Sequence, residues 1–198
     1  MSRAAVFLDR DGTINKEVSF LGDPAQLELE EGAVEGLAVL QAAGFVLLVA
    51  SNQSGVARGY FDEKAVKRVN TALSRMLARD GIRIESFHYC PHLVEGIVPG
   101  YARVCDCRKP KPGLIFKAAE EGDIDLSRSY AVGDSARDLE AGRAAGLRTV
   151  LVMTGFAKGA VEEVKEKGLA DHIAGDLADA ARWIVKDAGE MGDTIVNG

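Results

Sequence analysis

Two aspartates directly after the first apolar run of the chain have the spacing that points most clearly to chemistry. Residues 4–8 are continuously apolar, which predicts a short buried strand. Asp9 and Asp11 follow it one residue apart, with Gly12 behind them. Two carboxylates this close repel each other unless a cation or a shared proton relieves them. The pattern therefore indicates a Mg²⁺ site with one carboxylate available as a nucleophile. A plain polar turn is the alternative interpretation.

Strand-like and helix-like segments alternate along the rest of the chain. Apolar runs predict further strands at residues 45–50, 84–89, 129–132, 149–153 and near 172–174. Helical patterns lie between them, at residues 33–43, from 62 onward, 113–121 and 136–145, with two more around the last strand. Such alternation predicts an α/β fold with a doubly wound, mainly parallel sheet. Right-handed crossovers place the carboxyl ends of all the strands at one edge of the sheet.

Polar residues at that edge provide the parts of a phosphatase. Asp9 can attack phosphorus to give an aspartyl-phosphate, and Asp11 can donate a proton to the leaving alkoxide and then accept one from water. Ser51, after the second strand, and Lys109, before a helix, would hold the phosphoryl oxygens. Mg²⁺ would be held by Asp9, by Asp134 after the fourth strand, and by the main-chain carbonyl of Asp11.

These residues resemble the four motifs of the haloacid dehalogenase superfamily of phosphatases. The matching segments are residues 9–13, residues 51–53, Lys109 and residues 133–138, in the order that the superfamily requires. The resemblance implies a Rossmann-like fold, Mg²⁺ as the metal, and the roles given above for the matching positions. The roles of Lys111 and Asp138 are left open.

Three cysteines and a histidine form a second cluster between residues 90 and 107. Cys90, His92, Cys105 and Cys107 provide three sulfurs and an imidazole, a donor set that suits tetrahedral Zn²⁺. The alternative is that the cysteines are small buried hydrophobes. A small zinc-clipped loop would be structural, because four protein ligands leave no open position for substrate. The zinc-clipped loop would also hold the cationic residues that come directly after Cys107 in place over the pocket.

Within the superfamily, the combined motifs resemble the heptose bisphosphate phosphatases. This resemblance implies hydrolysis at C7 of a sugar bisphosphate with the C1 phosphate retained, and contacts from the loop at residues 17–20 and from Arg108. The expected substrate-binding residues are Arg10, Glu17, Val18, Ser19, Phe20, Ser51, Asn52, Gln53, Ser54, Arg108 and Lys109. The chain departs from the usual pattern at Ser51, where threonine is common, and at Phe20, where tyrosine is usual.

Two rival functions remain open. Histidinol-phosphate phosphatases, or another small-molecule phosphomonoesterase, would share the motifs and the zinc loop. A substrate carrying an amine would call for acidic pocket residues, whereas Arg108 and Arg58 favour a second anion. A zinc-clipped scaffold without activity is disfavoured because every proposed catalytic position holds a competent residue.

Bulk properties agree with a small enzyme. The 198 residues, 47% hydrophobic and 27% charged, fit one domain over residues 1–188 with a polar C-terminal tail at 189–198. No apolar run is long enough for a bilayer, and the N-terminus leads straight into the first strand, so we expect a cytoplasmic protein without membrane contact. The net charge of −6 argues against nucleic-acid binding. We expect a monomer.

Overall fold

The chain builds a six-stranded, all-parallel sheet with the strand order β3-β2-β1-β4-β5-β6. The computed structural model describes residues 2–196, with side chains as far as residue 190. The strands are β1 (Ala5–Leu8), β2 (Val46–Asn52), β3 (Ser86–Cys90), β4 (Tyr130–Gly133), β5 (Arg148–Val152) and β6 (His172–Ala174). This topology confirms the predicted doubly wound α/β fold.

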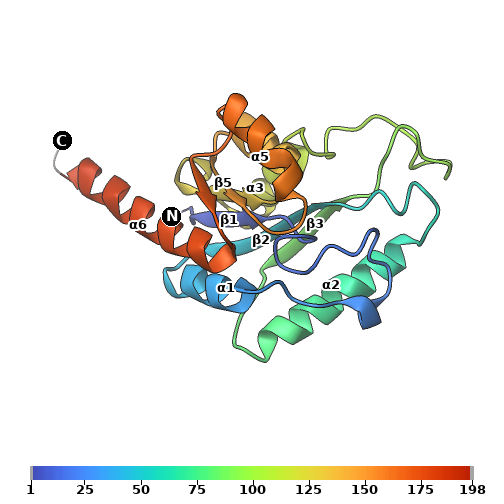
Figure 1. Cartoon of the computed structure of the whole chain (residues 1–198), viewed down its shortest axis with the longest axis horizontal. Coiled ribbons are helices and arrows are strands. Elements are labelled where there is room, and N and C mark those ends of the chain that lie inside the picture. Colours follow the sequence, from blue (N-terminus) through green and yellow to red (C-terminus); the bar gives the residue numbers. More distant parts are fainter. Residues whose placement is uncertain (1, 197–198) are drawn as a thin grey trace.

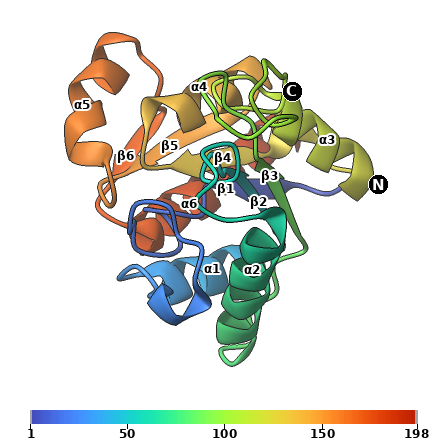
Figure 2. The same cartoon turned by 90° about the vertical axis from the view of Figure 1, so that its right-hand side faces the viewer.

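Helices cover both faces of the sheet (Figures 1 and 2). They are α1 (Ala33–Ala42), α2 (Glu63–Ala78), α3 (Gly113–Gly122), α4 (Ala136–Ala144), α5 (Ala157–Glu166) and α6 (Leu177–Val196), with short 3-10 helices η1 (Pro24–Gln26) and η2 (Leu126–Arg128). Successive side chains of β1 point to opposite faces of the sheet and so belong to two different hydrophobic cores. Val6 and Leu8 pack with α1, α2 and α6, whereas Ala5 and Phe7 pack with α3 and α4. Burial on both faces explains why β1 is apolar throughout.

Strand β1 lies at the centre of the sheet, between β2 and β4. Leu8 pairs with Val49 on one side and with Val132 on the other, and the Asp9 backbone N–H donates to the Val132 carbonyl at 2.9 Å. The two aspartates of the first motif therefore leave the sheet at its middle. The polar ends of β2 and β4 lie on either side, where ligands bind in sheets of this type.

The predicted elements are all present, with shifted ends. Asp62 caps α2 as predicted, because its side chain accepts from the Ala65 N–H at 2.8 Å. Strand β2 runs on through Ser51 and Asn52, since both pair with β3, so these residues belong to the strand and not to a turn. Helix α6 continues to Val196 through most of the stretch predicted as a tail, because extending an established helix costs little.

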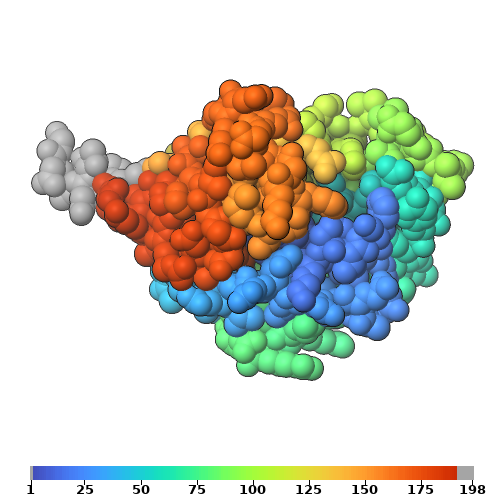
Figure 3. Space-filling model, in the orientation of Figure 1, coloured from blue at the N-terminus to red at the C-terminus, as the bar shows by residue number. Residues whose placement is uncertain are grey.

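The loops above the sheet meet over the end of β1. The Thr154 hydroxyl donates to the Gly12 carbonyl at 2.6 Å, which ties the loop before α5 to the loop after β1. Figure 3 shows the orange α5 region against the blue N-terminal segment. Gly12 has a φ of +79°, and a Cβ there would lie 2.2 Å from an Asp134 oxygen, so only glycine fits.

None of the helices within residues 2–196 combines the length and the apolar composition that crossing a bilayer requires.

Candidate active site

Three carboxylates converge at the carboxyl edge of the sheet. Asp9 follows β1, Asp134 follows β4 and Asp138 lies in the first turn of α4, and their oxygens lie within 4.8 Å of one another. They line a cavity of about 80 Å³. Burial and mutual repulsion raise the pKa of Asp9 to about 8, and burial raises the pKa of Asp134 to about 7. A divalent cation would relieve this repulsion, so the donor set fits Mg²⁺.

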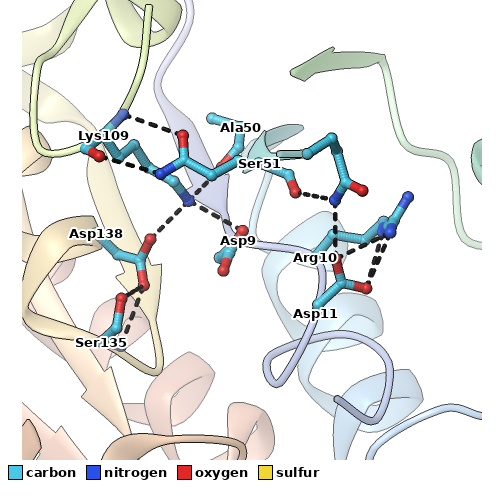
Figure 4. A network of polar contacts seen from close by, with 10 residues as sticks. Asp9, Arg10, Asp11, Ala50, Ser51, Lys109, Ser135 and Asp138 are labelled. Atoms are coloured by element: carbon cyan, nitrogen blue, oxygen red, sulfur yellow. Dashed lines mark hydrogen bonds and ion pairs between the residues drawn. The ribbon is translucent and has the colours of Figure 1, made fainter. Parts of the chain in front are cut away.

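Lys109 is the cation that the carboxylates already share. Its Nζ lies 2.9 Å from Asp9 Oδ1 and 2.6 Å from Asp138 Oδ1, and it donates to the Ala50 carbonyl at 2.6 Å (Figure 4). The side chain is only 5% exposed. Burial alone would lower its pKa, but the charges of Asp138 and Asp9 raise the pKa of Lys109 above its usual value. The ammonium is therefore charged and fixed beside the proposed nucleophile.

Asp138 has two contacts that explain its place in α4. One oxygen accepts from the backbone N–H and the hydroxyl of Ser135, which closes a capping box at the start of the helix. The other oxygen pairs with Lys109. The role that the sequence left open is thus both structural and electrostatic.

Asn52 holds the backbone of Lys109 on both sides. Its side-chain oxygen accepts from the Lys109 N–H at 3.1 Å, and its side-chain nitrogen donates to the Lys109 carbonyl at 3.0 Å. We predicted Asn52 as a substrate contact, but its amide is engaged with the peptide of Lys109. The residue borders the cavity and positions the lysine.

Asp11 lies apart from the carboxylate cluster and has its own set of donors. The guanidinium of Arg10 contacts both Asp11 oxygens, Gln53 Nε2 donates to Oδ2 at 2.8 Å, and Asn15 Nδ2 donates to Oδ1 at 2.9 Å. Gln53 Nε2 also donates to the Ser51 hydroxyl at 2.6 Å. The carboxyl that we assign to proton transfer is thus held in one orientation and linked to the residue assigned to phosphoryl binding (Figure 4).

One predicted substrate contact, Arg10, differs from the prediction, and a second, Val18, stays a prediction. The Arg10 side chain is fully buried and reaches Asn70 Oδ1 at 2.8 Å, so it supports Asp11 from behind and does not reach the cavity. Val18 is 40% exposed but lines neither cavity. Glu17 and Ser19, which flank Val18 in the loop after β1, both line the second cavity.

A second cavity of about 320 Å³ adjoins the first and holds most of the predicted substrate-binding residues. Those that line it are Glu17, Ser19, Phe20, Asn52, Gln53, Ser54 and Arg108, together with Asp11, Gly55, Arg58, Arg137 and Phe156. The Phe20 ring lies 5.5 Å from the guanidinium carbon of Arg58 and packs edge-on against Tyr60. The Phe20 ring therefore packs against an arginine and an aromatic ring, and it offers no hydroxyl group to a sugar.

Sequence reasoning missed several residues that line these cavities or lie behind them. Arg137 and Phe156 line both of them, and the Phe156 N–H donates to Asp134 Oδ2 at 2.7 Å. Asn15, which is buried, orients Asp11. Arg137 could have been found from its place between Asp134 and Asp138, on the first turn after β4. Phe156 carries no comparable signal, because it follows a strand that has no catalytic motif.

The four predicted zinc ligands come together in the loop before Lys109. Their ligand atoms lie within 4.8 Å of one another, with Cys107 Sγ 3.2 Å from Cys90 Sγ and 3.3 Å from both Cys105 Sγ and His92 Nδ1. Burial raises the pKa of the Cys90 thiol, a cost that a bound cation would remove. The donor set and its spacing fit a tetrahedral zinc ion.

Fold and site together define a hydrolase of the haloacid dehalogenase type. The HAD-hydrolase-like family model matches residues 106–180. The chain is 39% identical to the D-glycero-beta-D-manno-heptose-1,7-bisphosphate 7-phosphatase of Pasteurella multocida, over 92% of this chain and 97% of that protein. It is 40% identical to the D-glycero-D-manno-heptose-1,7-bisphosphate 7-phosphatase of Thermosynechococcus vestitus, over 93% and 96%.

A solved structure supports the same assignment. The D,D-heptose 1,7-bisphosphate phosphatase from B. bronchiseptica, complexed with magnesium and phosphate, superposes with a TM-score of 0.80 at 34% identity, over 93% of this chain and 99% of that chain. The chain therefore belongs to the heptose-1,7-bisphosphate 7-phosphatase family of the haloacid dehalogenase superfamily.

Proposed function

We propose that this protein is a Mg²⁺-dependent phosphatase that removes the C7 phosphate of D-glycero-D-manno-heptose 1,7-bisphosphate and leaves heptose 1-phosphate. One observation carries the proposal: the buried Lys109–Asp9 pair opens into a cavity that continues into a second, arginine-lined cavity. The first suits the phosphoryl group that is transferred, and the second suits the rest of a sugar phosphate. The relatives from Pasteurella multocida and Thermosynechococcus vestitus are named as phosphatases of this substrate.

The chemistry would begin with attack on phosphorus by a carboxylate oxygen of Asp9. A P–O bond forms to Asp9 and the bond from phosphorus to the C7 oxygen breaks, while Asp11 donates its proton to the leaving alkoxide. Lys109 and the Ser51 hydroxyl would stabilise the phosphoryl oxygens. In the second half, Asp11 takes a proton from water as the water oxygen attacks phosphorus, which releases inorganic phosphate and restores Asp9.

Two metals would complete the protein. Asp9, Asp134 and the main-chain carbonyl of Asp11 would hold Mg²⁺, which when bound neutralises charge on the phosphoryl oxygens. Cys90, His92, Cys105 and Cys107 would hold Zn²⁺ as a structural ion. That ion would fix the segment that leads into Arg108, whose guanidinium donates to the His92 carbonyl at 3.1 Å.

The rival functions receive less support. An amine-bearing substrate such as histidinol phosphate would face Arg58, Arg108 and Arg137 in the second cavity, and like charges repel. A scaffold without activity would have no use for a buried lysine held between two carboxylates. A monomeric state and a cytoplasmic location stay predictions from the sequence.

The test is phosphate release from purified protein with Mg²⁺, comparing both anomers of heptose 1,7-bisphosphate with histidinol phosphate. We expect kcat/KM to be highest for a heptose bisphosphate, and ³¹P NMR to show that the C1 phosphate remains on the product. Faster release from histidinol phosphate, or loss of the C1 phosphate, would overturn the proposal. The two anomers also decide which configuration the second cavity prefers.

A further inference from the structure

The second cavity brings together three guanidinium groups from distant parts of the chain. Arg58 follows β2, Arg108 precedes the catalytic lysine, and Arg137 lies in the first turn of α4. None of the three forms an ion pair with a carboxylate within the part of the chain whose side chains are described.

Two of the three guanidiniums are fixed by the protein, whereas the third is not. Arg108 donates to the His92 carbonyl and Arg58 lies against the Phe20 ring, with its Nε buried and without a hydrogen-bond partner. Arg137 is exposed and makes no hydrogen bond to a described side chain or backbone group. It is also the only arginine of the three that borders the phosphoryl-transfer cavity as well.

The position of Arg137 is unfavourable for the helix itself. It is the second residue of α4, where the partial positive charge of the helix N-terminus disfavours a cation. Two of the acids that line the cavities have their own cations, because Asp138 pairs with Lys109 and Asp11 with Arg10. The third, Glu17, accepts from the Ser19 N–H and forms no ion pair with Arg137. Because Arg137 has no ion-pair partner among the described side chains and borders both cavities, its guanidinium is available to an anionic ligand.

We propose that Arg137 is a specificity-determining residue: with Arg58 and Arg108 it binds the phosphate of the substrate that is not transferred. This inference rests on the proposed function, because it needs a substrate with two anionic groups. Arg137 borders both cavities, so it can reach a phosphate in the second cavity while the other phosphate lies beside Asp9. The residue would thus select bisphosphates over monophosphates.

The experiment compares kcat/KM for heptose 1,7-bisphosphate with kcat/KM for heptose 7-phosphate. For Arg137→Ala we expect a loss of about tenfold to a hundredfold on the bisphosphate, the size of one or two charge-assisted hydrogen bonds, and about threefold or less on the monophosphate. Arg137→Lys should recover part of the loss. Arg79→Ala, which removes an exposed arginine remote from both cavities, should change neither value.

A second readout does not depend on the chemical step. Inhibition by the product heptose 1-phosphate reports binding at the second cavity alone, and Arg137→Ala should weaken it by the same factor. Equal losses on both substrates, or no loss on the bisphosphate, would overturn the role of Arg137. If the wild-type protein does not prefer heptose substrates, the proposed function fails separately. The pair fructose 1,6-bisphosphate and fructose 6-phosphate then decides the role of Arg137 by the same ratio.

Discussion

Replacing Lys109 by methionine tests how the buried charges are balanced. The change keeps most of the side-chain volume and removes the cation that lies 2.9 Å from Asp9 and 2.6 Å from Asp138. Asp9, Asp134 and Asp138 then lie within 4.8 Å of one another with no positive group among them. We therefore expect Lys109→Met to make the stability of the protein depend on the catalytic metal.

The magnitude follows from the burial of the pair. Removing one partner of a buried ion pair costs about 3–5 kcal/mol, because the other charge stays buried and uncompensated. For a chain of this size, 1 kcal/mol lowers the melting temperature by about 2–4 °C, so the melting temperature should fall by roughly 6–20 °C in EDTA. With Mg²⁺ on Asp9 and Asp134, the remaining loss is the unpaired Asp138 and Ala50 oxygens, about 1–3 kcal/mol.

The assay is thermal unfolding of wild type and variant at pH 8.5, in EDTA and in Mg²⁺. Lys111→Met is the matched control, because Lys111 lies two residues away but pairs with Asp106 on the surface. Surface ion pairs contribute little to the free energy of unfolding, so Lys111→Met should have the same melting temperature as the wild type in both buffers. Lys109 does not balance the buried carboxylates if Lys109→Met has the same melting temperature as the control, or if Mg²⁺ stabilises the variant no more than the wild type.

The remaining predictions concern the two metals and the support of Asp11. Purified protein should contain about one zinc ion per chain by elemental analysis, and Cys107→Ser should lose it; zinc-free, fully folded wild type would contradict the proposed site. The raised pKa values of Asp9 and Asp134 mean that protons compete with Mg²⁺ in this pH range. The apparent Mg²⁺ affinity should therefore rise by more than about tenfold between pH 6 and 7, where both carboxyls must lose a proton, by about tenfold between pH 7 and 8, and level off above pH 8; a flat titration would contradict the protonation scheme. Asn70→Leu should cost about 1–3 kcal/mol in urea unfolding, since it leaves the buried Arg10 guanidinium without that acceptor; an unchanged unfolding midpoint would argue against this role.

The parts of the site that sequence reasoning predicted well are those that the sheet positions. Asp9 and Asp134 follow neighbouring parallel strands, so their meeting is a consequence of topology alone. The convergence of Cys90, His92, Cys105 and Cys107 was predictable from residue type and short spacing, whereas zinc itself stays a proposal.

What the sequence could not predict depends on tertiary contacts. Arg10 reads as a substrate-binding or surface cation, and only the position of Asn70, 60 residues away on α2, makes it a buried support. The sequence likewise gives no partner for the Asn52 side chain. In the structure its amide donates to the backbone carbonyl of Lys109, 57 residues later. Polar side chains can serve a substrate or another side chain equally well, and only packing decides between the two.

Asp9 should carry the phosphoryl group during turnover. The most direct measurement is to mix the protein with Mg²⁺ and heptose 1,7-bisphosphate, quench within the first turnover, and reduce with borohydride, which converts an aspartyl-phosphate to homoserine. Mass spectrometry of the peptide that contains Asp9 should find homoserine at this position, and none in Asp9→Asn or without substrate. Homoserine at another aspartate, or no reduction while phosphate is being released, would show that Asp9 is not the nucleophile.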